Sequence, residues 1–185
     1  MPTLFSSVLT LTVAVLTLST TPTDEPDSWS KPVNGLQARL SFARKKTFNG
    51  TPIITTYLEL RNVSDVGNVM EVPLDLEKIQ FTVTDSTGKV VPPYNGPFDG
   101  PSVELGMIRL PFDSFLRFNI ASSGTGVPKD EAALLDLGAS RDWVFKRADD
   151  KTYYLLAEFT VQKTKERHWF GTIEIPKTKI PTTNK

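Results

Sequence analysis

Apolar and polar side chains alternate along several short segments of this chain, and this alternation most constrains its fold. In the segment from Leu36 to Phe42 every second residue is apolar, and similar patterns cover Ile54 to Arg61, Ile79 to Thr84 and Leu116 to Ile120. Successive side chains of a β-strand point to opposite faces, so each segment is expected to form a strand with one buried and one solvated face. The pattern therefore predicts antiparallel sheets.

Two pairs of segments are expected to form hairpins. Asp85-Ser86-Thr87-Gly88 supplies an Asp-led turn with a glycine available for a positive φ, and Lys89 to Val91 returns as the partner strand. The longest alternating segment runs from Tyr153 to Val161. The alternating segment Trp169 to Ile175 follows the charged turn Gln162 to Arg167 and is expected to be its partner strand. These strand phases place six residues in the core: Leu58, Phe81, Phe118, Leu155, Phe159 and Ile173.

One stretch has residues that are typical of the start and the end of a helix. Residues Pro128 to Gly138 have acidic residues near the start, Ala and Leu at the centre and Gly at the end, which is typical of a helix of about two turns. The sequence lacks the repeated longer helices that parallel βαβ units need. It therefore predicts an all-β fold, an antiparallel Ig-like two-sheet β-sandwich with one short helix.

The N-terminus has the pattern of an export signal. The run from Leu4 to Leu18 carries no charge; it is short for a membrane span but fits the apolar region of a signal peptide. The residues before it lack Lys and Arg, which departs from that pattern, and a buried strand is the alternative. We expect a signal peptide at 1–19, a flexible leader at 20–31, a single domain at 32–181 and a tail at 182–185. The mature chain would then be secreted, periplasmic or in the cell envelope, without a transmembrane segment.

Composition excludes several classes of function. Lys plus Arg and Asp plus Glu both number 21, and this balance argues against a nucleic-acid binder. The absence of cysteine excludes a disulfide scaffold and a thiolate metal site, and the single histidine, His168, excludes a two-His zinc site. No common catalytic or phosphate-binding motif is present. We therefore expect no catalytic residue, cofactor or metal; a hydrolase built on His168 with Asp149 or Asp150 is the minor alternative.

The loop 92–101 is the first candidate binding site, with Pro92, Pro93, Tyr94 and Phe98 as its contact residues. Its prolines fix φ, so the loop loses little entropy on binding, and its two aromatic side chains offer contact area. These properties suit an inhibitory or docking loop. They also fit an ordinary connection between the two sheets.

The second candidate site is a basic turn. Residues 141–185 hold ten Lys or Arg against six Asp or Glu, a net charge of +4, whereas residues 1–140 have a net charge of −4. Lys163, Lys165 and Arg167 cluster on the expected final hairpin. This cluster could bind an anionic partner such as a cell-surface polymer, or it could be a solvated turn.

Two long stretches carry a resemblance to known proteins. Trp29 to Leu40 and Leu58 to Asp65 resemble a group of small exported bacterial proteins with no assigned activity. The closing part, Tyr153 to Val161 with His168 to Pro176, is similar to the same group. This resemblance implies export and supplies no catalytic residues.

A second resemblance concerns the fold. The strand end Asn62-Val63-Ser64, the hairpin Thr82 to Gly88 and the turn Leu110-Pro111-Phe112 resemble bacterial intracellular proteinase inhibitors, which are Ig-like sandwiches. Asn62-Val63-Ser64 also matches the glycosylation acceptor pattern, although a turn at a strand end is the simpler interpretation. We expect a non-catalytic binding or interaction module whose partner is a protein or a cell-envelope component, and not a nucleic acid. The alternative is a proteinase inhibitor acting through loop 92–101.

Overall fold

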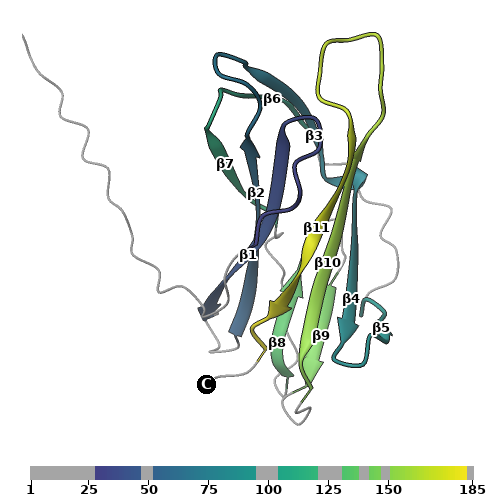
Figure 1. Ribbon diagram of the computed structural model, residues 1–185. Coiled ribbons are helices and arrows are strands. Elements are labelled where there is room, and N and C mark those ends of the chain that lie inside the picture. Colours follow the sequence, from purple (N-terminus) through teal and green to yellow (C-terminus); the bar gives the residue numbers. More distant parts are fainter. Residues whose placement is uncertain are drawn as a thin grey trace, which may run out of the picture.

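The fold is seen in a computed structural model, and its described part is all-β, with antiparallel sheets packed together as a sandwich (Figure 1). This confirms the predicted fold class. The expected signal peptide lies outside the described part. The structure describes residues 28–46, 52–94, 104–120, 131–137, 142–146 and 151–182. The strands are β1 (Leu36–Lys46), β2 (Pro52–Asn62), β3 (Met70–Asp75), β4 (Ile79–Asp85), β5 (Val90–Val91), β6 (Glu104–Leu110), β7 (Phe115–Asn119), β8 (Glu131–Asp136), β9 (Asp142–Lys146), β10 (Tyr153–Val161) and β11 (Gly171–Ile180).

Three sheets organise these strands. In the first, β2 pairs antiparallel with β1 on one side; on its other side it pairs antiparallel with β7 and parallel with β8, and β9 follows β8. The second sheet has the order β11-β10-β4-β5, and all its pairings are antiparallel. Strands β3 and β6 form a two-stranded ribbon, and the 3₁₀ turn η1 (Leu76–Lys78) leads from β3 into β4.

The strand phases predicted from the alternation are confirmed. All six residues expected in the core face it, and only Phe81 and Phe118 among them are partly buried rather than fully buried. The predicted hairpin of β10 and β11 is present, and the turn before β5 has Gly88 at a φ of 86°. Because apolar side chains from both sheets meet between them, removal of this apolar surface from water stabilises the sandwich. Of the six predicted core residues, the four that are fully buried are Leu58, Leu155, Phe159 and Ile173.

The short helix expected between Pro128 and Gly138 was a wrong prediction, because Glu131–Asp136 forms strand β8. Residues 128–130 and 138 lie outside the described part. Strand β8 pairs with β2 on one side and with β9 on the other, and Leu134 and Leu135 are both buried. The helix preference of Ala and Leu amounts to less than about 1 kcal/mol per residue, so pairing on both edges and burial of both faces outweigh it.

The sandwich has two ends. The upper end in Figure 1 holds the loop 63–69, the turn 111–114 and the hairpin loop 162–170 between β10 and β11. The lower end holds the turn 86–89 between β4 and β5, and residues 92–94 directly after β5. No helix in the described residues is long and apolar enough to cross a membrane.

Candidate binding surface at the upper end

Asn62, the last residue of β2, holds the loop 63–69 in place. Its side chain is buried, and its amide nitrogen donates hydrogen bonds to the carbonyl oxygens of Asn68 (3.1 Å) and Leu110 (2.8 Å). Its amide oxygen accepts hydrogen bonds from the backbone N–H and the hydroxyl of Ser64. The side chain thus joins both ends of the loop to the end of β6. The Asn62-Val63-Ser64 motif therefore serves as a strand end here, with its amide facing the interior.

The backbone of Asn62 also holds the turn 111–114. Its N–H donates to the Ser114 carbonyl oxygen (3.1 Å), and its carbonyl oxygen accepts from the Asp113 N–H (3.0 Å). Asp113 has a φ of 55°, a region that Asp visits more readily than most residues, and its carboxylate pairs with Arg61. The Ser114 N–H and hydroxyl both donate to the Pro111 carbonyl oxygen. The turn is therefore closed by hydrogen bonds within itself and tied to β2.

A short turn before β1 connects this region to the β10–β11 hairpin. Gly35 has a φ of 80°, and a Cβ on it would lie 2.6 Å from the Cβ of Ser64, so only glycine fits here. The indole N–H of Trp169 donates to the Val33 carbonyl oxygen (2.8 Å), and the Asn34 side-chain amide donates to the Phe170 carbonyl oxygen (2.9 Å). The loop 63–69 and the hairpin loop are therefore attached to the same turn.

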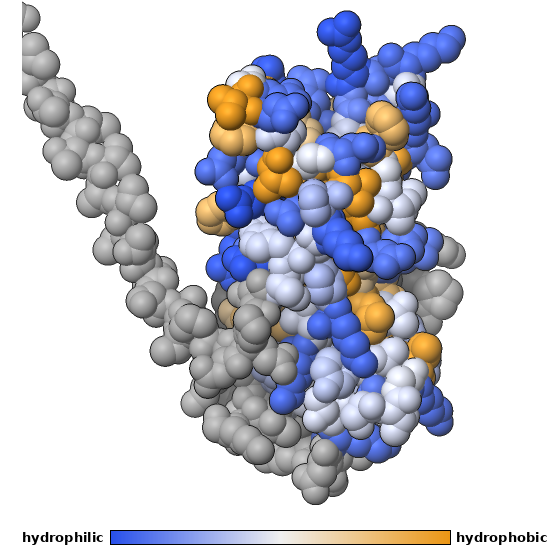
Figure 2. Space-filling view, viewed as in Figure 1, coloured by the Kyte–Doolittle hydropathy of each residue, from blue (hydrophilic) through white to orange (hydrophobic). Residues whose placement is uncertain are grey.

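The loops of the upper end carry exposed apolar side chains. Val66 is 85% exposed, Phe115 is 61% exposed, and Val69 and Phe112 are also exposed. We call these four residues the upper apolar surface. Figure 2 shows orange side chains over the upper part of the molecule, beside blue side chains that project from the top. Four exposed apolar side chains at one end make this end the candidate interaction surface.

The hairpin loop carries the cations that the sequence predicted as a cluster. Lys163, Lys165 and Arg167, which we call the basic hairpin, are all exposed, and the ammonium of Lys163 lies 5.1 Å from the ring centroid of Phe170. Glu166 is the one acidic residue of the segment 162–170, so the segment has a net charge of +2 with His168 neutral. The structure thus places positive charge at the same end of the sandwich as the upper apolar surface (Figure 1).

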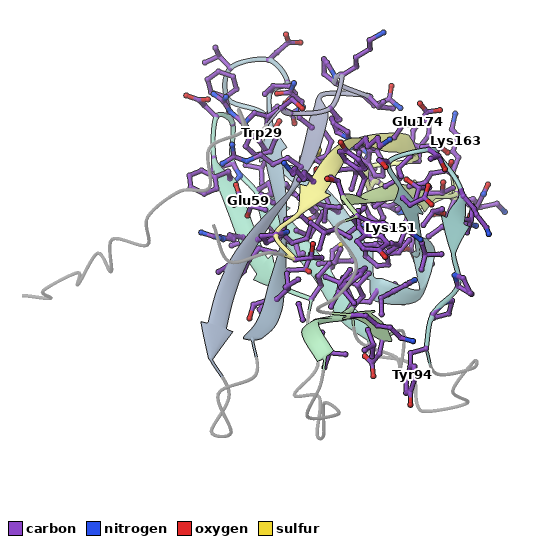
Figure 3. All side chains as sticks on the ribbon, turned by 90° about the horizontal axis from the view of Figure 1, so that it is seen from below. Trp29, Glu59, Tyr94, Lys151, Lys163 and Glu174 are labelled. Atoms are coloured by element: carbon purple, nitrogen blue, oxygen red, sulfur yellow. The ribbon has the colours of Figure 1, made fainter. Side chains whose placement is uncertain are left out.

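The proline-rich loop begins at the other end of the molecule. Pro92 and Pro93 are exposed, and Tyr94 is 65% exposed, while its N–H donates to the Asp142 carbonyl oxygen over 2.6 Å. Phe98 and the rest of the loop to 101 lie outside the described residues. Figure 3 shows Tyr94 and Lys163 on well-separated parts of the structure. The two predicted sites therefore do not form one surface.

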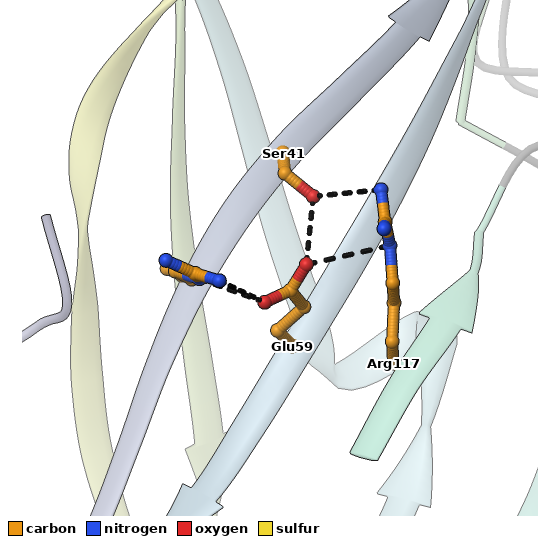
Figure 4. A network of polar contacts seen from close by, with 4 residues as sticks. Ser41, Glu59 and Arg117 are labelled. Carbon is orange, nitrogen blue, oxygen red and sulfur yellow. Dashed lines mark hydrogen bonds and ion pairs between the residues drawn. The ribbon is translucent and has the colours of Figure 1, made fainter. Parts of the chain in front are cut away.

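A charged network on the outer face of the first sheet was missed by the sequence analysis (Figure 4). Glu59 lies between Arg39 of β1 and Arg117 of β7 in the sheet register, and its side chain is only 4% exposed. One carboxylate oxygen accepts from Arg39 Nε (2.7 Å), and the other contacts Arg117 Nε (3.3 Å) and the Ser41 hydroxyl (2.9 Å). The alternation assigned Glu59 to the solvated face, and the arginines cover it there.

Both arginines of this network also stack on aromatic rings. The guanidinium of Arg39 lies 4.6 Å from the ring centroid of Trp29, and that of Arg117 lies 3.9 Å from the centroid of Tyr57. Such stacking fixes long side chains that would otherwise be free to move. Their cross-strand positions are the only signal that could have found the network, and these depend on register. Its contacts are internal, so we assign it to the stiffness of the sheet.

A shallow groove lies on the outer face of the second sheet, with a volume of about 470 Å³. It is lined in part by Glu158 and Glu174, which are direct cross-strand partners, and by Lys177. Like charges directly opposite each other in a sheet are unfavourable. The groove borders the β-bulge between Leu155 and Ala157, and charged and apolar side chains both line it, so it favours no single ligand class.

The residues of the hydrolase alternative are only partly described. His168 is half-buried, with Nδ1 3.4 Å from the Thr164 hydroxyl and Nε2 3.4 Å from the Gln162 carbonyl oxygen. Asp149 and Asp150 lie outside the described residues. Among the residues that the structure describes, no three His, Cys, Asp or Glu side chains gather where they could hold a metal ion.

Comparison with known proteins adds no assignment. No family model, no curated protein and no solved structure matches this chain. Function must therefore be inferred from the chain's own surface.

Proposed function

We propose that this protein is an exported, non-catalytic binding module that attaches to a protein or cell-envelope component through the upper end of its sandwich. One observation carries the proposal: exposed apolar side chains and exposed cations occupy the same end of the sandwich, where hydrogen bonds hold the loops in place (Figure 1). Export rests on the uncharged run Leu4 to Leu18.

The apolar side chains of this surface favour binding, because their exposure to water is unfavourable. Burial of apolar surface contributes about 25 cal/mol per Å², and aromatic side chains such as Phe112 and Phe115 offer the largest areas. An anchored loop also loses little conformational entropy when it binds. Asn62 and Gly35 supply that anchoring.

Affinity capture tests this proposal. The full chain with a C-terminal tag would be incubated with cell-envelope and secreted fractions, and partners would be identified by mass spectrometry. The variant Val66→Ser/Phe112→Ser/Phe115→Ser should lose the specific partner. Val90→Ser, which changes an exposed valine at the lower end, should keep it. A partner that the triple variant retains and that Val90→Ser loses would contradict the proposal.

Proteinase inhibition through loop 92–101 is the second candidate function. It is favoured by Tyr94, whose ring is exposed while its backbone is hydrogen-bonded to Asp142 at the start of β9. An inhibitory loop needs this combination of exposure and a fixed backbone. Titration of secreted proteases with the full chain tests this candidate. Loss of protease activity that Tyr94→Ala or Phe98→Ala abolishes would favour it over upper-end attachment, and no loss at micromolar protein would reject it.

A further inference from the structure

We infer that the upper end docks on the surface of an anionic phospholipid bilayer, with the upper apolar surface entering the interface and the basic hairpin contacting the headgroups. This inference rests on the proposed function, because it names the partner of the same surface. It is carried by the presence of apolar and cationic side chains at one end of the sandwich. At a bilayer surface, apolar side chains enter the boundary between headgroups and acyl chains, and cations contact the headgroups.

The apolar side chains lie on projecting loops. Val66 belongs to the loop 63–69, and Phe112 belongs to the turn 111–114, which is closed by hydrogen bonds to Pro111. Phe115 begins β7 beside that turn. Apolar side chains at loop tips can enter a fluid interface without a complementary groove. A bilayer therefore suits this geometry better than a partner that must itself supply a pocket.

The charges of the upper end favour an anionic surface. Asp113 is paired with Arg61, and Glu71 is paired with Arg109, so these four groups largely neutralise one another. The hairpin segment 162–170 keeps a net charge of +2, and Asp65 is the remaining acid of the upper loops. Each Lys or Arg near an anionic leaflet strengthens attachment, so the basic hairpin faces a complementary charge there.

A hydrated anionic polymer would explain only half of this surface. Such a polymer attracts cations, but it gives Val66, Phe112 and Phe115 no apolar medium to enter. The hydrogen bonds of Trp169 and Asn34 to the neighbouring backbone fix the hairpin relative to the apolar loops. Both groups therefore lie at the same end of the sandwich, the end that we propose faces the bilayer (Figure 1).

Vesicle sedimentation with the full chain tests the inference. The probes are vesicles of phosphatidylcholine alone and of phosphatidylcholine mixed with phosphatidylglycerol. We expect binding to rise with the phosphatidylglycerol content and to weaken with added salt. Lys163→Ala/Lys165→Ala/Arg167→Ala should weaken binding by about tenfold or more, as three lost contacts with an anionic leaflet require. The matched control is Lys89→Ala/Lys146→Ala/Lys151→Ala, which removes three exposed cations away from the upper end and should bind as the native chain does.

A fluorescence experiment separates insertion from simple charge attraction. Phe112→Trp should show a blue shift of its emission, relative to the native chain, only with phosphatidylglycerol-containing vesicles. Val66→Ser/Phe115→Ser in this background should remove the shift. Circular dichroism and thermal unfolding of every variant establish that it is folded. If the Phe112→Trp protein folds and its emission does not change, the apolar part of the inference is overturned.

The outcomes distinguish this inference from the proposed function. If the native chain binds phosphatidylglycerol-containing vesicles no more strongly than vesicles of phosphatidylcholine alone, the lipid inference fails. The proposed function still stands if affinity capture yields an envelope protein or polymer that the upper-end variants lose. If those variants keep every captured partner as well, both proposals fail.

Discussion

The side-chain amide of Asn62 donates a hydrogen bond of 2.8 Å to the carbonyl oxygen of Leu110, a residue 48 positions later in the chain. This contact joins the end of β2 to the end of β6 in a buried site. The same amide group binds both ends of the loop 63–69, and the Asn62 backbone binds the turn 111–114. One residue therefore contacts both the loop 63–69 and the turn 111–114, which carry Val66, Val69 and Phe112 of the upper apolar surface.

Replacement of Asn62 by Ala should destabilise the protein by about 3 kcal/mol, because the buried Leu110 carbonyl oxygen loses its donor and the loop loses three further bonds. Urea unfolding measures the change. Asn68→Ala is the matched control, since the side chain of Asn68 is exposed and only its backbone carbonyl accepts from Asn62. It should change stability by no more than about 0.5 kcal/mol. Equal effects of the two substitutions would show that Asn62 does not organise this end.

Two glycines at the upper end allow a second comparison. Gly35 and Gly67 have φ values of 80° and 83°, but a Cβ at Gly35 would meet Ser64 at 2.6 Å, whereas a Cβ at Gly67 would meet open space. Gly67→Ala should cost only the backbone strain, about 1 kcal/mol. Gly35→Ala should cost about 1–3 kcal/mol more, because of the steric overlap. Unfolding midpoints that match within error would contradict the close approach at Gly35.

The strands were predictable wherever one face of the strand is buried and the other is exposed to solvent. The alternation from Leu36 to Leu40 and from Tyr153 to Val161 is confirmed by the burial of every second side chain. Strand β8 was missed because its local sequence favours a helix and both of its faces are buried, so its pattern shows no alternation. The parallel pairing of β2 with β8 joins residues far apart in the chain, which no local pattern reveals.

The candidate surface was predictable only in part. The three cations of the basic hairpin are close in sequence, so the local sequence was sufficient to predict their cluster. Val66 and Phe112 come from loops that follow different strands, and these loops are brought together by the pairing of Met70 with Leu110 and by the hydrogen bonds of Asn62. Glu59 sits at a position of the alternation that predicts solvent exposure, and its burial depends on side chains from two neighbouring strands.

Glu59→Gln should destabilise the protein by about 2 kcal/mol, because two arginines lose a carboxylate partner that is almost fully buried. The control is Asp113→Asn, which removes the charge of an exposed pair with Arg61. It should cost no more than about 1 kcal/mol. Chemical unfolding at low and high salt checks both values. The prediction fails if Glu59→Gln costs no more than the control or if salt abolishes its effect.

The turn between β4 and β5 predicts a dependence of stability on pH. The Thr87 hydroxyl donates a hydrogen bond of 2.6 Å to Asp85 and lowers the pKa of this carboxyl below its ordinary value of 3.8, and the backbone N–H groups of Thr87 and Lys89 add to the effect. Because the folded-state pKa is depressed, the carboxylate stabilises the fold above pH 3.8, and this contribution is lost as the pH falls through the folded-state value.

Asp85→Asn should therefore lower the urea midpoint at pH 7, and the difference from the native chain should vanish at low pH. Thr87→Val removes the hydroxyl donor and should raise the pKa of Asp85, as followed by NMR titration of its carboxyl carbon. An unchanged pKa in Thr87→Val, or a stability difference that persists at low pH in Asp85→Asn, would refute this assignment.

Hydrogen–deuterium exchange of the full chain, with and without its captured partner or phosphatidylglycerol-containing vesicles, tests most directly whether the upper end is the contacting surface. We predict slower exchange in the segments 63–69, 111–116 and 162–170 on binding, with unchanged exchange in 85–94 at the lower end. Protection confined to 85–94, with the three upper segments unchanged, would contradict attachment through the upper end.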